Sequence, residues 1–225
     1  MLTDGVITLA VMTAGDAAAL VAGEDDAIVR RLAGGPATPA SARRHIRERA
    51  EDWRGDWYRG GTKLAWGVRD AATGTLAGTA EVQLVQPELP AGAANLSYSV
   101  FPPWRGRGFG SRAVALMCAF LAARTTATLA VLRIDADNAA SLRVAERSGF
   151  RPAQELAGPR ASMRWFAHDL RTRPAAGLQS RMFCPSCGLD MYWVVADDDP
   201  VGGWWQCDEA HRWRRAFGGF APLDP

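Results

Sequence analysis

Long apolar runs, early basic residues and a strong excess of charge are all missing from this chain of 225 residues. The longest uninterrupted apolar stretch, from Ala113 to Ala123, is shorter than the roughly 20 residues of a membrane-spanning helix, so we expect no membrane segment. No basic residue precedes Arg30, whereas a secretory signal begins with positive charge, so we expect a cytoplasmic protein. The formal net charge of +2 is too small to indicate a nucleic-acid partner by composition alone.

The residues that are present have the composition of a packed globular protein, with 48% hydrophobic and 22% charged residues. At roughly 150 residues a domain, the length favours one medium domain and a small module. We expect the domain over residues 1–172, a linker with Pro174 and Gly177 over residues 173–181, and the module over residues 182–225. No internal repeat is found, which argues against a solenoid or a propeller.

Hydrophobic periodicity predicts an α+β order of elements in the larger domain. The predicted strands cover residues 5–13, 63–68, 76–85, 94–101, 127–134 and 162–170. The predicted helices start at Asp16 and at Thr38, the latter running to about Trp57, and cover residues 110–123 and 138–148. Residues 70–74 form the turn of a hairpin, and the two prolines after Phe101 end a strand because proline cannot donate to the ladder.

A glycine-rich loop, WRGRGFGS at residues 104–111, separates the strand that ends at Phe101 from the next helix. Free amides at the helix start, together with Arg105 and Arg107, favour an anion such as a phosphate. A Walker loop would need a lysine after Gly110, and a dinucleotide fingerprint would need a third glycine at Ser111, so neither pattern fits. On the loop alone, a tight turn that binds no ligand remains an alternative.

The pattern Arg105-x-x-Gly108-x-Gly110 resembles the acyl-CoA pyrophosphate signature of the GNAT N-acetyltransferase superfamily. The stretches WRGRGFGSRAVALMCAFLAA and LRIDADNAASLRVAERSGF resemble the branch with the ribosomal-protein-alanine acetyltransferases, over about residues 1–172. This resemblance implies a mixed, mostly antiparallel sheet with flanking helices. It also implies that acetyl-CoA donates an acetyl group to a primary amine, in a small molecule or at a protein N-terminus, by direct attack in a ternary complex.

The resemblance also assigns the residues that bind acetyl-CoA. In the family, the strand before the loop diverges from the next parallel strand, and backbone groups hold the pantetheine in the wedge, which would be lined here by Ser99, Val100 and Phe101. The pyrophosphate would be held by the amides of Arg105, Gly106, Arg107, Gly108, Phe109, Gly110 and Ser111. Asn138 would contact the CoA arm, and it is equally a good N-cap for the helix that follows it.

The catalytic residues are marked less clearly by the resemblance. Many members of the superfamily carry a tyrosine where this chain has Ala145, and the resembled branch suggests Ser141 as the proton donor to the leaving thiolate. The glutamate common on the strand before the loop is replaced by Asn95. Glu81 is then the nearest carboxylate that could act as the base, directly or through water, although a solvent-facing role is an alternative. The acceptor wall would include Arg44, His45, Glu48, Trp53 and Trp57; the alternative is that both tryptophans belong to the core and that His45 is a solvated helix residue.

Three of the four cysteines lie in the C-terminal module, while Cys118 lies in the apolar stretch and is expected in the core. Cys184, Cys187, Cys207 and His211 have the Cys-x2-Cys and Cys-x3-His spacing of a zinc site. With strands predicted at residues 191–196 and 203–206, the module resembles a zinc ribbon with a structural Zn2+. A redox Cys-x-x-Cys is the alternative, but it would leave the other two ligands unexplained.

Residues 175–225 hold four arginines and seven acidic residues, and this balance near −3 argues against nucleic acid as the partner of the module. We expect it to contact a protein partner or to pack on the larger domain. A non-catalytic acyl-CoA-binding scaffold, whose ribbon recruits a protein, is the main alternative function, and RNA-directed modification ranks last. Dimers are common in the resembled branch, so a homodimer would fit. The sequence does not identify the acceptor amine.

Overall fold

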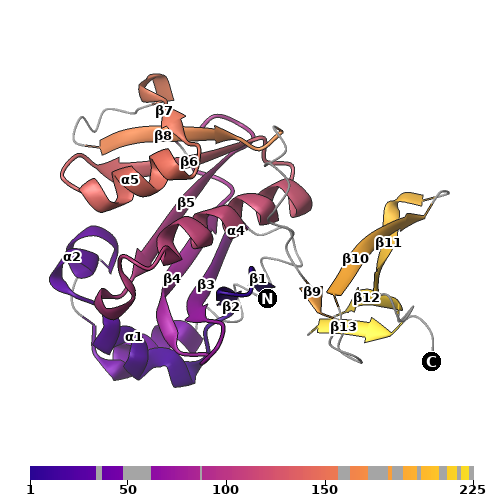
Figure 1. The fold of residues 1–225 in the computed structure, drawn as a ribbon, viewed down its shortest axis with the longest axis horizontal. Helices are drawn as coiled ribbons and strands as arrows, with labels where there is room; N and C mark the ends of the chain where they lie inside the picture. The colour runs from indigo at the N-terminus through magenta and orange to yellow at the C-terminus, as the bar shows by residue number, and fades with distance from the viewer. Residues whose placement is uncertain are drawn as a thin grey trace. The chain divides into compact units, whose positions relative to one another are not determined.

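The structure is a computed structural model of the chain. It describes residues 1–33, 37–47, 62–86, 88–156, 163–171, 182–183, 190–196, 199–207, 212–216 and 219–222. The chain divides into two compact units, whose main segments are Thr3–Gln179 and Ser180–Pro225 (Figure 1). Within the described ranges, no helix has the length and apolar character needed to cross a membrane.

A mixed sheet forms the centre of the larger unit. Its strands are Leu2–Thr3 (β1), Ile7–Ala10 (β2), Lys63–Asp70 (β3), Leu76–Gln83 (β4), Ala93–Val100 (β5), Leu129–Asp135 (β6), Arg151–Pro152 (β7) and Met163–Asp169 (β8). Their order in the sheet is β1-β2-β3-β4-β5-β6-β8-β7. The pairs from β2 to β5 and the pairs of β8 are antiparallel, whereas β5 and β6 are parallel. The expected mostly antiparallel sheet is therefore present.

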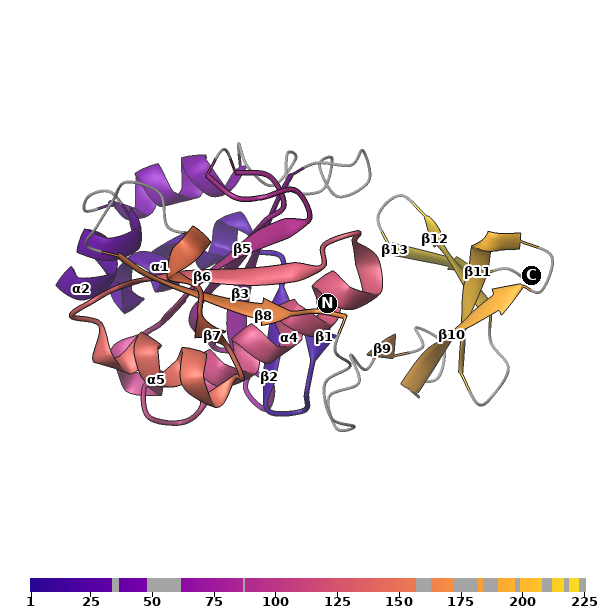
Figure 2. The same ribbon diagram turned by 90° about the horizontal axis from the view of Figure 1, so that it is seen from above.

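Helices cover both faces of this sheet. They are Ala14–Asp16 (η1), Ala17–Gly23 (α1), Asp26–Ile28 (α2), Val29–Ala33 (η2, a π-helix), residues 39–47, Pro102–Trp104 (η3), Phe109–Arg124 (α4), Ala139–Arg147 (α5) and Gln154–Leu156 (η4). Trp66 of β3 packs edge-to-face on Phe120 of α4, while its neighbour Ala65 packs with Ala17 and Ala42. Because successive strand residues point to opposite faces, α4 covers one face and α1 with the helix of residues 39–47 covers the other (Figure 2).

The parallel strands β5 and β6 pair over only part of their length. Their register runs from Ala93 opposite Leu129 to Leu96 opposite Leu132. Beyond this point, residues 97–100 pair only with β4, and residues 133–135 pair only with β8, among the strand pairings of the described residues. The strands therefore separate into a wedge, and the wedge widens toward the loop that follows β5.

The helix boundaries follow from capping side chains, as expected. The Ser41 amide donates to Thr38 Oγ1 at 3.1 Å, with Pro39 in the first turn, so this helix begins where predicted; its expected extension to Trp57 lies outside the described residues. The expected cap of the first helix is different, because the Asp16 carboxylate accepts from the Thr13 amide at 2.7 Å and not from an amide of α1.

Strand boundaries near the N-terminus also differ from the prediction. The strand expected at residues 5–13 is limited to β2, because a turn precedes it: Asp4 Oδ1 accepts from the amides of Val6 and Ile7, both at 2.9 Å. The strands β1 and β7 have two residues each and carry no periodicity that could predict them. The hairpin of β3 and β4 and the strand β5, which ends before Pro102, agree with expectation.

The smaller unit is a second, antiparallel sheet in the order β13-β12-β11-β10-β9. Its strands are Met182–Phe183 (β9), Asp190–Ala196 (β10), Asp199–Cys207 (β11), Arg212–Ala216 (β12) and Gly219–Pro222 (β13). The predicted hairpin is confirmed, with Met191 opposite Cys207 and Val195 opposite Gly203. Of the predicted zinc ligands, Cys184, Cys187 and His211 lie outside the described residues. The part of the chain that the structure describes contains no cluster of metal-binding side chains, so the zinc site stays a prediction.

Candidate functional site

A cleft of about 440 Å³, here called the wedge cleft, lies where β5 and β6 separate. Its walls come from β5, β6, the glycine loop, the start of α4, the turn after α2, and α5. Among the predicted cofactor residues, the wall includes Ser99, Val100, Arg105, Gly106, Gly108, Phe109, Gly110, Ser111 and Asn138. Phe101 and Arg107 are described residues that do not line it. The cleft thus brings together most of the residues that the sequence assigned to acetyl-CoA.

The glycine loop presents helix amides to this cleft. Gly106 and Gly108 have φ angles of 74° and 81°, which lie in the left-handed region that glycine adopts without strain. Gly108 is the N-cap of α4, and no described side chain caps the helix there. The amides of Phe109, Gly110 and Ser111 therefore have no intrahelical acceptor, and with the helix dipole they form an anion-binding end.

Arg105 has a different role from the one its sequence position indicates. Its guanidinium binds both carboxylate oxygens of Asp25, at 2.6 and 3.0 Å, and its Nε donates to the Val100 carbonyl at 2.9 Å. The Arg105 hydrogen bonds lower the pKa of Asp25 to about 2. The side chain of Arg105 therefore fastens the loop to α2, so its charge is already neutralised. Arg107 lies over the ring of Trp104, 4.7 Å from its centroid.

Five arginines nevertheless line the wedge cleft, and Asp135 is the only acidic residue in the described part of its wall. The arginines are Arg31, Arg105, Arg133, Arg143 and Arg147. Arg143 and Arg147 are exposed on one face of α5, one helical turn apart, and form no ion pair with a described residue. They were not predicted as site residues, although two arginines four residues apart on the helix that follows Asn138 are a signal visible in the sequence.

The side chains of Ser99, in β5, and Phe101, which follows β5, contact other parts of the domain. The Ser99 hydroxyl lies 2.8 Å from Thr79 Oγ1 and accepts from the Thr79 amide at 3.2 Å, so this side chain is bonded to β4. Phe101 packs in a core cluster with Ile28 and Leu76, and its ring lies directly against Gly23. The ring of Phe101 therefore lies in the core, and the expected contact of its backbone with pantetheine stays a prediction.

Three hydrogen-bonding side chains from β5 and the start of α5 line the cleft. Asn138 Oδ1 accepts from the Ser141 amide at 3.2 Å, which confirms its role as the N-cap of α5. The Tyr98 hydroxyl donates to Ser141 Oγ at 3.2 Å, and both side chains line the cleft. Burial raises the pKa of Tyr98, so the phenol is protonated at neutral pH. Tyr98 was not predicted as a site residue.

Glu81 lies on the face of the sheet opposite to that of Tyr98. In the pairing of β4 with β5 it is directly across from Ser97. It does not line the wedge cleft. Its carboxylate forms an ion pair with Lys63 at 2.9 Å and accepts from Gln83 Nε2 at 2.5 Å. The predicted base therefore lies one strand away from the wedge, beside a cation.

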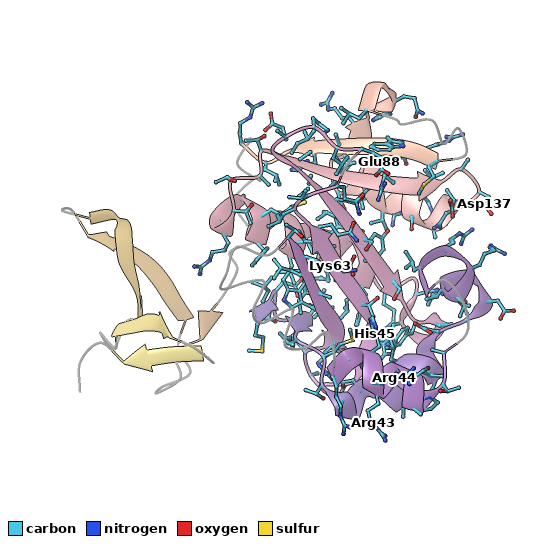
Figure 3. The ribbon with its side chains drawn as sticks, turned by 180° about the vertical axis from the view of Figure 1, so that it is seen from behind. Arg43, Arg44, His45, Lys63, Glu88 and Asp137 are labelled. Carbon is cyan, nitrogen blue, oxygen red and sulfur yellow. The ribbon has the colours of Figure 1, made fainter. Side chains whose placement is uncertain are left out.

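A second depression of about 410 Å³, here called the polar groove, adjoins this face. It is lined by Thr62, Lys63, Gln83, Val85, Gln86, Glu88 and Arg133. Arg133 belongs to the walls of both cavities; its Nε donates to Asn95 Oδ1 and its Nη1 pairs with Glu88, each at 3.1 Å. In Figure 3, Lys63 lies between Glu88 and His45 on this face. The two cavities thus meet at Arg133, beside the residue that replaces the family's glutamate.

Two further groups of residues near the site can be placed. Arg31, on the π-helical turn η2, bridges to Asp135 at 3.3 Å and to Asp137 at 3.1 Å, so these carboxylates join the turn to the end of β6. Arg44 and His45 lie on the helix of residues 39–47. The other expected acceptor-wall residues, Glu48, Trp53 and Trp57, lie outside the described residues.

The comparisons with known proteins establish the class. The family described as "Acetyltransferase (GNAT) domain" matches residues 7–151, which is more than half of the chain. The chain therefore belongs to the GNAT acetyltransferase family, and it is an enzyme whose acetyl donor is acetyl-CoA. No curated protein matches it.

Solved structures share the fold at low identity. RimL, a ribosomal L7/L12 alpha-N-protein acetyltransferase in complex with coenzyme A, has a TM-score of 0.58 and 16% identity, over 73% of this chain and 94% of that chain. The ribosomal-protein-S5-alanine acetyltransferase of Vibrio fischeri has 0.56 and 14%, over 74% and 94%. The acetyltransferase AAC(6')-Ib, in complex with paromomycin and acetyl-CoA, has 0.60 and 16%, over 76% and 99%. These values show a common fold.

Proposed function

We propose that this acetyltransferase moves the acetyl group of acetyl-CoA to a primary amine, at a protein N-terminus or in a small molecule, by direct attack in a ternary complex. One observation carries the proposal: the wedge cleft contains the uncapped start of α4, and it shares Arg133 with the polar groove. Neighbouring structures include both a protein alpha-N-acetyltransferase and an aminoglycoside acetyltransferase, so both acceptor types are open to this fold.

The donor fits the wedge cleft by charge and by hydrogen bonding. The pyrophosphate of CoA would accept from the amides at residues 109–111, and Arg143 and Arg147 would attract its phosphates. The pantetheine would lie along residues 97–100, whose edge faces the gap beyond the last β6 pair. Asn138 would hold the start of α5 against the CoA arm. This orientation directs the thioester toward the Tyr98 and Ser141 hydroxyls.

The chemistry requires a neutral amine, a polarised carbonyl and a proton for the leaving thiolate. Ser141 is the proposed hydrogen-bond donor to the sulfur, and Glu81 is the proposed acceptor of the amine proton, through water. Lys63 competes for that carboxylate, so the approach of the amine must displace or share this ion pair. Cys118 is excluded as an acyl carrier at neutral pH, since burial raises the pKa of its thiol to about 12.

The acceptor would approach from the polar groove. Its lining is almost entirely hydrogen-bonding, and Arg133 is shared with the wedge cleft, so a hydrophilic amine bound there has a short path to the thioester. Proximity in such a ternary complex can supply much of the rate even where the base is weak.

A matched experiment separates catalysis from binding alone. Purified protein is mixed with acetyl-CoA and a panel of amines that contains an N-terminal peptide library and aminoglycosides, and released CoA thiol is measured. The proposal expects amine-dependent thiol release with stoichiometric acetylated product. Acetyl-CoA binding without release for every amine would support the scaffold alternative.

For the C-terminal unit, we propose a zinc ribbon over residues 182–225, joined by a linker at residues 173–181 to the acetyltransferase domain of residues 1–172, in a cytoplasmic protein. Support comes from the confirmed hairpin of β10 and β11 and from the spacing of Cys184, Cys187, Cys207 and His211. Native mass spectrometry should show one zinc per chain and the subunit number. Cys184→Ser should lose the metal while Cys118→Ser keeps it, and retention by both would remove the site.

A further inference from the structure

The leaving thiolate needs a hydrogen-bond donor, and α5 does not offer a phenol. The position that often carries tyrosine in the superfamily is Ala145, and this residue has no exposed surface. A phenol nevertheless enters the same cleft from β5, because the Tyr98 hydroxyl donates to Ser141 Oγ at 3.2 Å across a sequence separation of 43 residues. Both residues line the wedge cleft, and Tyr98 lies on the face of the sheet that α4 covers.

The Tyr98 ring is held by close packing. A Cβ atom at Gly110, in the first turn of α4, would lie 3.0 Å from Tyr98 Cε2 and 3.5 Å from Val144 Cγ2. Across the strand pair, Tyr98 lies opposite Ala80, which is 2% exposed. The ring is therefore confined between the start of α4 and α5, and Gly110 serves this packing as well as the phosphate loop. A side chain so confined can hold its hydroxyl at one position.

The direction of the hydrogen bond determines what Ser141 can do. Because Ser141 Oγ accepts from the Tyr98 phenol, its own hydroxyl proton remains available for the cleft. A hydroxyl that accepts one hydrogen bond becomes a stronger donor in the next. Burial raises the pKa of Tyr98 and so keeps the phenol in the donating form.

We infer that Tyr98 is a positioning residue that orients and strengthens Ser141 as the hydrogen-bond and proton donor to the CoA sulfur. The inference deepens the proposed function and rests on its placement of the thioester. In the step, the amine nitrogen forms the C–N bond and the electron pair of the C–S bond passes to sulfur. Sulfur takes the Ser141 proton, and Ser141 takes one from Tyr98. Glu81 takes the proton that the amine releases, through water, and passes it to solvent, and solvent reprotonates Tyr98.

The direct test uses bound coenzyme A and needs no acceptor. In complexes with CoA, thiolate absorbance is titrated with pH for wild type, Tyr98→Phe, Ser141→Ala and the double variant. A donor at the sulfur stabilises the thiolate, so wild type should lower the thiol pKa by about one unit from the free value. Ser141→Ala and the double variant should both restore the free value, and Tyr98→Phe should restore about half of the shift. Ser148→Ala removes another α5 hydroxyl, one without a hydrogen-bond partner, and should change nothing.

A merely structural Tyr98 would change CoA affinity or melting temperature and leave the thiol pKa unchanged, and that result would overturn the inference. Additive shifts in the double variant would also overturn it, because Tyr98 would then act independently of Ser141. If wild type binds CoA but no amine is ever acetylated, the proposed function fails while the thiol titration still reports on the pair.

Discussion

The wedge cleft and the polar groove share Arg133 but arrange their charges differently. In the wedge cleft, arginines outnumber acids, and Arg143 and Arg147 are unpaired among the described residues. In the polar groove, Arg133 pairs with Glu88, and Lys63 pairs with Glu81, which lies beside the groove and is not part of its lining. The first arrangement suits a polyanion such as CoA. The second presents alternating donors and acceptors with little net charge, which suits a hydrophilic amine.

The largest effect should come from closing the anion-binding end of the wedge cleft. In Gly108→Glu, the new carboxylate would meet the pyrophosphate, so the Kd for acetyl-CoA should rise at least about 100-fold, or ~2.7 kcal/mol, by calorimetry. Gly74→Glu is the matched control. The φ of Gly74 is 71°, so a side chain there meets the same backbone strain, and no atom of the described residues would lie within 4 Å of the new Cβ. Equal affinity in both variants would show that the loop is not the donor site.

A change at Glu81, beside the polar groove, should affect turnover of the amine and not binding of the donor. Glu81→Gln should lower kcat/KM for the amine about 10- to 100-fold while the Kd for acetyl-CoA stays unchanged, because the carboxylate faces the acceptor side. Steady-state kinetics with calorimetry checks both values, and Glu146→Gln on the exposed end of α5 is the control. A loss of donor affinity with intact turnover would reverse the assignment of the two cavities.

The unpaired arginines of α5 should contribute a smaller, salt-dependent part of donor affinity. Replacing Arg143 and Arg147 by alanine should raise the Kd for acetyl-CoA about tenfold at low salt and leave the Kd for pantetheine unchanged. The control is Arg164→Ala, an exposed arginine of β8 outside the cleft. An equal loss for pantetheine would indicate altered packing of α5.

The smallest effect concerns the anchor of the loop. Asp25→Asn keeps an N-cap acceptor for α2 but removes the pair with Arg105, which should lower the melting temperature by a few degrees or less, since the pair is partly solvent-exposed. The pKa of Asp25 is depressed to about 2, so this stabilisation is fully present above pH 4 and is lost as the pH falls toward 2. Melting curves of both proteins should converge over that interval. A constant difference would assign the effect to another contact.

The sequence predicts the elements that local rules determine. Thr38 and Asn138 cap helices as their types indicate, and the glycines at 106 and 108 adopt the left-handed conformation that a phosphate-binding loop uses. The resemblance adds the divergence of β5 from β6, which the register confirms. Each of these features depends on a few residues that are close in the sequence.

Pairings between distant side chains could not be predicted. Arg105 binds Asp25 across 80 residues, and Tyr98 binds Ser141 across 43. No periodicity relates such partners, because the sheet and helix packing bring them together. For the same reason the sequence does not predict that the Phe101 ring packs against Gly23 in the core.

The central claim is that acetyl-CoA occupies the wedge between β5 and β6, and amide hydrogen exchange tests it most directly. Adding acetyl-CoA should slow exchange at residues 97–100 and 109–111 and at the start of α5, with little change at the polar groove until an amine is added. Protection confined to the polar groove, or absent from both strand and loop, would contradict the account.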